Sequence, residues 1–318
     1  VNVEGGEGND SFNIENISGD LKVNAGNGND RVGQYDYLEN IKGDIEVDLG
    51  DGDDLLNSRY TEANLVIKGE GGKDNVDSKY GVKVELEGGA NDDILYAYDF
   101  LDGKLLGGTG NDTLTADYNA NISGSNRSRD KNENNVYDAT QVYVLDGGEG
   151  NDTFRRDEDN DPDNDGTYGL ILYGEEGNDS FNYLQNVKII DAGTGDDEVA
   201  ILGNGTASPT SIKGGDGYDK LTINANYPYW SIISGFEEIS ADGTGVIPDH
   251  IGAAGTTLKF NYVNSGNLDF SAESDANIEI NTSKTSGTGD DTIIGGQLAD
   301  TINSLDGNDT VSGGAGND

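Results

Sequence analysis

The chain has 318 residues, of which 61 are acidic and 19 basic, so its formal net charge is −42. This charge excludes nucleic acid as a natural partner, because phosphate backbones are bound by Lys and Arg, and it argues against an anionic membrane surface. Cysteine is absent, so no disulfide braces the fold. No apolar run approaches the roughly 18 residues of a membrane-spanning helix, so we expect no membrane span.

A nine-residue unit recurs along most of the chain, and its clearest copy runs from Gly5 to Asn13. The unit reads Gly-Gly-x-Gly-x-Asp-x-apolar-x. Glycine tolerates the positive φ values of a sharp turn. Such a turn can point carbonyl oxygens inward, and the aspartate adds a carboxylate; Ca²⁺ prefers six to eight oxygens of these two kinds. The unit therefore predicts tight turns that bind calcium.

The pattern resembles the calcium-binding nonapeptide of the repeats-in-toxin (RTX) family of secreted bacterial proteins. The resemblance implies an all-β fold, a right-handed parallel β-roll or β-solenoid with Ca²⁺ in its Gly/Asp-rich turns. Each ion would lie between the turns of neighbouring coils. The predicted metal ligands are the sixth-position aspartates Asp10, Asp30, Asp54, Asp74, Asp93, Asp112, Asp152, Asp179, Asp197, Asp219, Asp291, Asp300, Asp309 and Asp318.

Apolar residues recur at two places relative to each nonapeptide. The eighth position is apolar in every complete copy, as at Leu95 and Leu114, and an apolar residue stands two positions before each of the first ten copies, as at Leu86 and Leu105. Several of the latter have another apolar residue two positions earlier, and this alternation is typical of strands with one buried face. Each coil is therefore predicted to hold a strand, a Gly/Asp turn and a short second strand.

The spacing of the aspartates predicts how the coils stack in residues 1–222. From Asp10 to Asp112 they are 19 to 24 residues apart. In the RTX family two nonapeptides make one coil, so this spacing indicates calcium turns on one side only. Polar insertions are expected at 119–141 and 157–169.

The second insertion contains a further acidic motif, Asp161-x-Asp163-x-Asp165-Gly166. It matches the first half of an EF-hand loop, although the twelfth position would be Leu172 in place of the bidentate Glu. Asp161, Asp163 and Asp165 are therefore predicted ligands of an additional calcium ion. The alternative is a solvated run of acids.

Residues 223–285 lack the nonapeptide, and we expect a β-helical continuation without calcium turns. Two of their phrases, Ser234 to Ile239 and Leu268 to Ala272, resemble segments that precede the RTX runs of bacterial surface-layer proteins. In residues 286–318 the aspartates are nine residues apart, which predicts calcium turns on both sides. This last segment ends in mid-repeat, and we expect the chain to be part of something longer.

A tyrosine follows the key aspartate by six residues at Tyr60, Tyr80 and Tyr118, and by five at Tyr98. Stacked coils would align these rings along one edge. Structural stacking is one interpretation, and a contact surface for a glycan or a neighbouring subunit is the other.

No catalytic motif is present. The chain has no Cys nucleophile, no Gly-x-Ser-x-Gly elbow, no phosphate loop and no His-Glu-x-x-His site, and its single histidine, His250, has no obvious partner. We therefore predict no catalytic residues, no enzyme activity, and no cofactor other than multiple Ca²⁺ ions.

The favoured function is a calcium-dependent structural module of a secreted bacterial cell-surface protein, above all a surface-layer lattice. The alternatives are the stalk or C-terminal RTX region of a large adhesin and the non-catalytic module of a secreted enzyme. The family resemblance implies type I secretion, an extracellular location and folding driven by external calcium. Self-association or a cell-surface glycan would supply the further partner.

Overall fold

The all-β class predicted from the sequence is confirmed by the computed structural model, a parallel β-solenoid. The chain divides into two compact units, residues 1–176 and, in the main, 177–318. Within the described residues one short 3-10 helix, η1 (Trp230–Ile232), accompanies the strands, and no helix is long and apolar enough to cross a membrane. The structure describes residues 1–33, 37–59, 64–98, 100, 102–117, 142–155, 169–184, 187–201, 209–223, 230–241, 245–252, 254–262, 266–282, 290–304 and 307–318.

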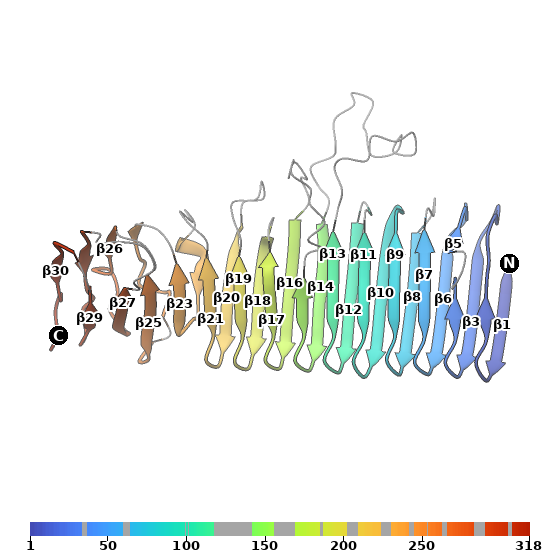
Figure 1. Ribbon diagram of the computed structural model, residues 1–318, viewed down its shortest axis with the longest axis horizontal. Coiled ribbons are helices and arrows are strands. Elements are labelled where there is room, and N and C mark those ends of the chain that lie inside the picture. The colour runs from blue at the N-terminus through green and yellow to red at the C-terminus, as the bar shows by residue number, and fades with distance from the viewer. Residues whose placement is uncertain are drawn as a thin grey trace, which may run out of the picture. The chain divides into compact units, whose positions relative to one another are not determined.

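In the first unit each coil begins with a long strand, and these strands pair in parallel in chain order (Figure 1). Each long strand runs into the Gly/Asp turn, so its last residues belong to the nonapeptide. The long strands are β1 (Asn2–Glu7), β3 (Leu21–Asn27), β6 (Ile45–Asp51), β8 (Asn64–Gly71), β10 (Lys83–Ala90), β12 (Asp102–Thr109), β14 (Val142–Glu149) and β16 (Gly169–Glu176).

A second, shorter strand follows each turn and forms the opposite sheet of the same unit, again in parallel chain order. The turns between long and short strands line one edge of this unit, the lower edge in Figure 1. The short strands are β2 (Ser11–Phe12), β4 (Arg31–Val32), β7 (Leu55–Arg59), β9 (Asn75–Lys79), β11 (Ile94–Tyr98), β13 (Thr113–Asp117) and β15 (Thr153–Arg155), and β5 (Leu38–Glu39) also pairs with β7.

The register stacks equivalent residues of successive coils on one another. Leu86 pairs with Leu105, and Leu105 pairs with Leu145. Leu95 pairs with Leu114 on the opposite sheet. All of these side chains are buried. The two apolar positions that flank every turn therefore form a continuous core between the sheets. Burying one leucine there contributes roughly 2 kcal/mol to the stability of the fold.

The eighth nonapeptide position is buried throughout, except at Phe12 and Ile302, which are half-buried, and Val311, which is exposed. These three residues lie in the first and last coils of the structure, where a neighbouring coil covers one side only. The prediction that this position forms the core is therefore confirmed for the inner coils.

The second unit contains three sets of parallel strands. One set ends at β22, and a new set begins at β24 in the following coil. The long set is β18 (Val187–Thr194), β20 (Ser211–Asp216) and β22 (Ile233–Ser234). The opposite set is β17 (Ser180–Leu184), β19 (Glu198–Ile201), β21 (Lys220–Ile223), β23 (Glu238–Ala241), β25 (Thr257–Tyr262), β27 (Asn277–Thr282) and β29 (Thr301–Asn303). The new set is β24 (Gly245–Val246), β26 (Asn267–Asp269), β28 (Thr292–Ile294) and β30 (Thr310–Ser312).

Strands β23, β25 and β27 belong to the stretch without nonapeptides, and they continue the parallel pairing of β21. Their inward residues include Ile239, Phe260 and Ile280, all fully buried. The predicted insertions at 119–141 and 157–169 fall outside the described residues, apart from Gly169 at the start of β16.

Candidate metal centre

The turns between the long and short strands depend on glycine at the second and fourth nonapeptide positions. In the turn between β12 and β13 these are Gly108, with φ 115°, and Gly110, with φ 137°. A Cβ on Gly108 would collide with the carbonyl oxygen of Gly89, and one on Gly110 with the backbone of Asn91. Glycine is therefore required both by the left-handed conformation and by the close approach of successive coils.

Three turns place another residue in this left-handed region. Glu70 and Glu175 take the second position with φ values of 72° and 73°, and Asn91 takes the fourth with φ 77°. Asn91 donates from Nδ2 to the carbonyl of Ala90 at 2.8 Å. Asparagine tolerates this region better than most residues, whereas a glutamate there carries backbone strain.

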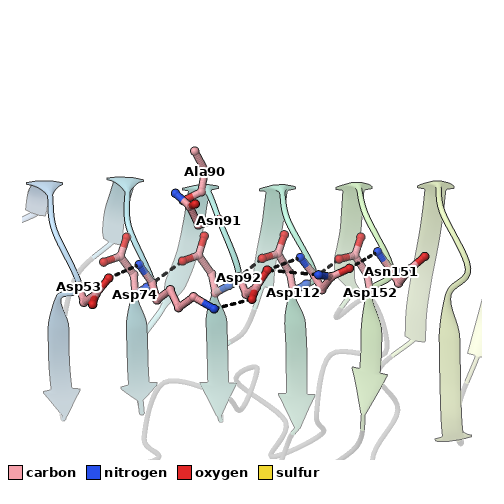
Figure 2. A network of polar contacts seen from close by, with 11 residues as sticks. Asp53, Asp74, Ala90, Asn91, Asp92, Asp112, Asn151 and Asp152 are labelled. Carbon is pink, nitrogen blue, oxygen red and sulfur yellow. Dashed lines mark hydrogen bonds and ion pairs between the residues drawn. The ribbon is translucent and has the colours of Figure 1, made fainter.

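The sixth-position aspartates form a ladder from coil to coil. The backbone N–H of each donates to the Oδ1 of its counterpart in the following coil (Figure 2). In the first unit these bonds run from Asp10 to Asp30 (2.7 Å), Asp30 to Asp54 (2.6 Å), Asp54 to Asp74 (2.9 Å), Asp74 to Asp93 (2.8 Å), Asp93 to Asp112 (2.8 Å) and Asp112 to Asp152 (2.7 Å).

The second oxygen of these carboxylates has a different environment. Oδ2 is buried and accepts no hydrogen bond in Asp10, Asp30, Asp54, Asp74, Asp93, Asp112, Asp197 and Asp219. A buried carboxylate oxygen without a partner costs several kcal/mol unless it is protonated or bound by a cation. A repeated row of such atoms therefore indicates a positively charged ligand.

The first glycine of each unit shows what these oxygens face. A Cβ on Gly107 would collide with Oδ2 of Asp112 and with the carbonyl oxygen of Gly147 in the next coil. Gly88 repeats the arrangement with Oδ2 of Asp93 and the carbonyl oxygen of Gly107. A carboxylate and a carbonyl from neighbouring coils thus converge beside Gly88 and Gly107, and likewise beside Gly69 and Gly214. Both are oxygen donors of the kind that Ca²⁺ prefers. The residues present fit calcium.

Burial changes the protonation of these aspartates. Removal from water raises the pKa of Asp54, Asp93 and Asp219 to about 7, with a smaller contribution from neighbouring carboxylates. The same desolvation raises the pKa of Asp74, Asp112, Asp152 and Asp197 to about 6. The hydrogen bond that each accepts from the backbone opposes this shift. Without a bound cation, keeping these buried aspartates ionised therefore costs free energy.

A second ladder, missed in the sequence, runs beside the first through the fifth position. Here the side-chain Oδ1 accepts from the backbone N–H of the following coil, so the two ladders point in opposite directions along the chain. The bonds join Asn9 to Asn29 (3.0 Å), Asn29 to Asp53 (3.2 Å), Asp53 to Lys73 (2.9 Å), Asp92 to Asn111 (3.1 Å) and Asn111 to Asn151 (2.9 Å). The signal for it was the Asn or Asp that precedes most key aspartates.

Lys73 interrupts this second ladder in the first unit, since its side chain has no acceptor. Its Nζ instead reaches the carboxylate of Asp92 in the next coil at 2.5 Å (Figure 2). This pair lowers the pKa of Asp92 and raises that of Lys73. The ion pair links the two coils in place of the hydrogen bond that Lys73 cannot accept. Both side chains are exposed, so its stabilising effect is small.

In the second unit the carboxylate ladder joins Asp179 to Asp197 (2.8 Å) and Asp197 to Asp219 (2.9 Å). It then continues into the stretch without nonapeptides, where the N–H of Asp219 donates to Oε2 of Glu237 at 2.8 Å. Glu237 is buried, and desolvation raises its pKa. The sequence did not single it out, because Gly235 and Glu237 stand closer together than the matching Gly214 and Asp219.

At the C-terminal end the bonds skip alternate repeats. Asp291 donates to Oδ1 of Asp309 at 3.0 Å, and Asp300 donates to Oδ1 of Asp318 at 3.1 Å. Each of these aspartates therefore bonds to the aspartate 18 residues further on and not to the one nine residues away. Asp309 is half-buried and Asp318 exposed, whereas Asp291 and Asp300 are buried.

The sequence also singled out an acidic motif and a set of tyrosines. Asp161, Asp163 and Asp165 lie outside the described residues, as do Tyr60 and Tyr118. Tyr80 and Tyr98 do contact each other across adjacent coils, edge to face, with ring centroids 5.5 Å apart. This contact fits structural stacking, and the alternative of a contact surface for a glycan or a neighbouring subunit stays a prediction.

The sequence matches the family model of the RTX calcium-binding nonapeptide repeat, in four copies, at residues 101–122, 144–161 and 285–318. Comparisons with curated proteins and with solved structures give no match. The chain thus carries RTX calcium-binding repeats, and the predicted resemblance to this family is confirmed.

Proposed function

We propose that the chain is a calcium-dependent structural module of a secreted bacterial cell-surface protein, in which calcium ions hold successive coils together. The observation that carries this proposal is the row of buried Oδ2 atoms without hydrogen-bond partners. Those of Asp74, Asp93, Asp112 and Asp219 lie beside a glycine carbonyl of the next coil. Bound Ca²⁺ would neutralise these carboxylates and share ligands between neighbouring coils.

The ligands in this proposal are the sixth-position aspartates. From Asp30 to Asp112 each uses Oδ1 to accept the hydrogen bond of the preceding coil, which orients the carboxylate and leaves Oδ2 for the ion. Asp300 differs, because its Oδ2 accepts the N–H of Gly296 at 2.6 Å. Asp112 illustrates the arrangement, with its Oδ2 beside the carbonyl of Gly147. Asp161, Asp163 and Asp165 are proposed as ligands of an additional ion on sequence grounds alone.

Calcium would then control folding. The chain has a net charge of −42, and many of its carboxylates are brought together in the ladder. Their mutual repulsion and burial oppose folding in the absence of a cation, so binding energy becomes folding energy. In a secreted RTX protein this would delay folding until the chain meets external calcium.

Calcium titration of the chelated chain tests this proposal, followed by far-UV circular dichroism and analytical sedimentation. We expect cooperative formation of β-structure as calcium is added. Full β-structure before any calcium is added would contradict the proposal, because the ladder would then be stable without a cation.

The finer proposal is a surface-layer lattice, and it is supported by two phrases that resemble segments of surface-layer proteins, Ser234 to Ile239 and Leu268 to Ala272. Phe236, Ile239 and Phe270 of these two segments are buried in the core of the coil. These three side chains therefore do not form a lattice contact. Sedimentation is therefore decisive. Calcium-dependent growth into large ordered assemblies supports the lattice, whereas a folded monomer favours an adhesin stalk or the appendage of a secreted enzyme.

A further inference from the structure

A cluster of three carboxylates lies in the second unit, next to the nonapeptide turn that begins at Gly295 but outside it. Asp249 follows β24, and Glu273 and Asp275 lie between β26 and β27. One carboxylate oxygen from each residue lies within 4.8 Å of the others. None of the three belongs to a Gly-Gly-x-Gly-x-Asp unit, so this cluster is separate from the ladder described above.

Glu273 is the buried member of the cluster, and its exposed fraction is 0%. Its Oε1 accepts the backbone N–H groups of Asp275 (3.2 Å) and Ala276 (3.0 Å), which fixes the carboxylate within the turn. Its own carbonyl accepts the N–H of Gln297 at 2.9 Å, which ties the turn to the next coil. Its Oε2 is buried and has no hydrogen-bond partner.

The other two carboxylates are exposed. Asp249 precedes Glu273 in the sequence and comes from another coil, whereas Asp275 follows Glu273 in the same turn. Oδ1 of Asp249 accepts the N–H of Ser274 at 2.6 Å, so the loop after β24 is held against the turn that contains Glu273. Asp275 is the close neighbour whose charge, after desolvation, raises the pKa of Glu273. The salt bridges found among the described residues include none of these three carboxylates.

We infer that Asp249, Glu273 and Asp275 bind a calcium ion that ties the loop after β24 to the turn before β27. Three converging carboxylates without a basic partner repel one another, and a divalent cation relieves this repulsion. The donors are all oxygens, which suits hard cations such as Ca²⁺ and not Zn²⁺ or copper. The exposed pair leaves a path for the ion, and the buried Oε2 supplies the innermost ligand.

This site does not depend on the nonapeptide ligands, and its test keeps the two proposals apart. Glu273→Gln retains the Oε1 acceptor for Asp275 and Ala276 and removes only the charge. Glu279→Gln is the matched control, because Glu279 lies on β27 in the same coil, outside the cluster. Bound calcium per chain is measured by equilibrium dialysis in calcium chloride for both variants and for the unaltered chain.

We expect Glu273→Gln to bind one calcium ion fewer than the unaltered chain and Glu279→Gln to bind the same number. In calcium Glu273→Gln should unfold at a lower urea concentration than the unaltered chain. In chelator it should show at least as much β-structure by far-UV circular dichroism as the unaltered chain, because a buried charge has been removed. A purely structural glutamate would not produce this reversal of sign.

Asp249→Asn is the second variant, since its exposed side chain keeps the acceptor for Ser274, and it should also lose one ion. An unchanged calcium count in both variants overturns the site while leaving the nonapeptide ligands standing. An unaltered chain that binds no calcium overturns both proposals. Protection by magnesium equal to that by calcium at the same concentration overturns the assignment to calcium.

Discussion

The backbone N–H of Asp93 donates to Oδ1 of Asp112 at 2.8 Å, across 19 residues of sequence, while Oδ2 of the same Asp112 is buried without a hydrogen-bond partner. One carboxylate therefore has two distinct roles. Its first oxygen links two coils directly, and its second is left for a cation. The strength of the coil-to-coil contact and the affinity for calcium are coupled through this single group.

Replacing Asp112 with Asn should separate these two roles. The amide oxygen can still accept the N–H of Asp93, but the negative charge on Oδ2 is lost. We expect calcium binding at the two adjoining sites to weaken by about tenfold or more, equivalent to roughly 1.4 kcal/mol per site. The measurement is a calcium titration by calorimetry with counting of bound ions.

Asp48→Asn is the control for this variant, because Asp48 lies half-exposed on β6, outside the ladder. It should titrate like the unaltered chain. Unchanged stoichiometry and affinity in Asp112→Asn would show that the sixth-position aspartate is not a calcium ligand.

The stability of the calcium-free chain should fall as pH rises. The folded-state pKa values of Asp54 and Asp93 are raised to about 7, and those of Asp74 and Asp112 to about 6. An unfolded aspartate titrates near 4, so the folded state binds more protons between about pH 4 and about pH 7. The stabilisation is complete below about pH 4 and is lost as pH rises through these raised values.

The amount of β-structure in chelator at about pH 5 and about pH 8, followed by far-UV circular dichroism, measures this effect. With calcium present the dependence should reverse, because protons compete with the ion for the same carboxylates and binding tightens as pH rises. A calcium-free chain that gains stability between these two pH values would contradict the burial of the ladder.

Gly110→Ala should be strongly destabilising. Gly110 has φ 137°, and a Cβ there would collide with the backbone of Asn91 in the preceding coil. The left-handed conformation alone costs an alanine about 1–2 kcal/mol, and the collision adds to it. We expect a loss of at least about 2 kcal/mol in urea unfolding with calcium present.

Gly19→Ala is the matched control for this change, because a Cβ on Gly19 meets no atom within 4 Å. It should alter stability by less than about 0.5 kcal/mol. Equal effects of the two substitutions would mean that the close packing of successive turns does not limit the sequence there.

Calcium binding by the acidic run in the second insertion can be tested by counting bound ions. Deleting residues 157–165 should lower the number of bound calcium ions by at least one. Replacing Asp161, Asp163 and Asp165 with Asn keeps the loop length and should have the same effect, since it removes the charged ligands. An unchanged ion count in both variants would identify the run as solvated acids.

Most of the fold could be predicted from the nine-residue repeat. Apolar residues at the eighth position and two residues before each unit predicted the two sheets, and Leu95 and Leu105 lie in the core accordingly. The sixth-position aspartates were predicted as calcium ligands in stacked turns, whereas the hydrogen bonds that join them from coil to coil were not predicted. The fifth-position ladder escaped prediction because the residue type varies there, as at Asp92, Asn111 and Lys73, although its spacing is that of the sixth position.

The amino-acid sequence determined the coil by itself, because glycine, aspartate and an apolar residue at fixed offsets dictate a turn, a carboxylate and a buried strand. Only the tertiary structure decided which oxygens remain without partners, as at Oδ2 of Asp112, because that depends on how neighbouring coils approach one another. It also decided that Glu237 extends the ladder. Likewise, it brought Asp249 beside Glu273 and Asp275, since residues of different coils meet only when the strands between them pair in parallel.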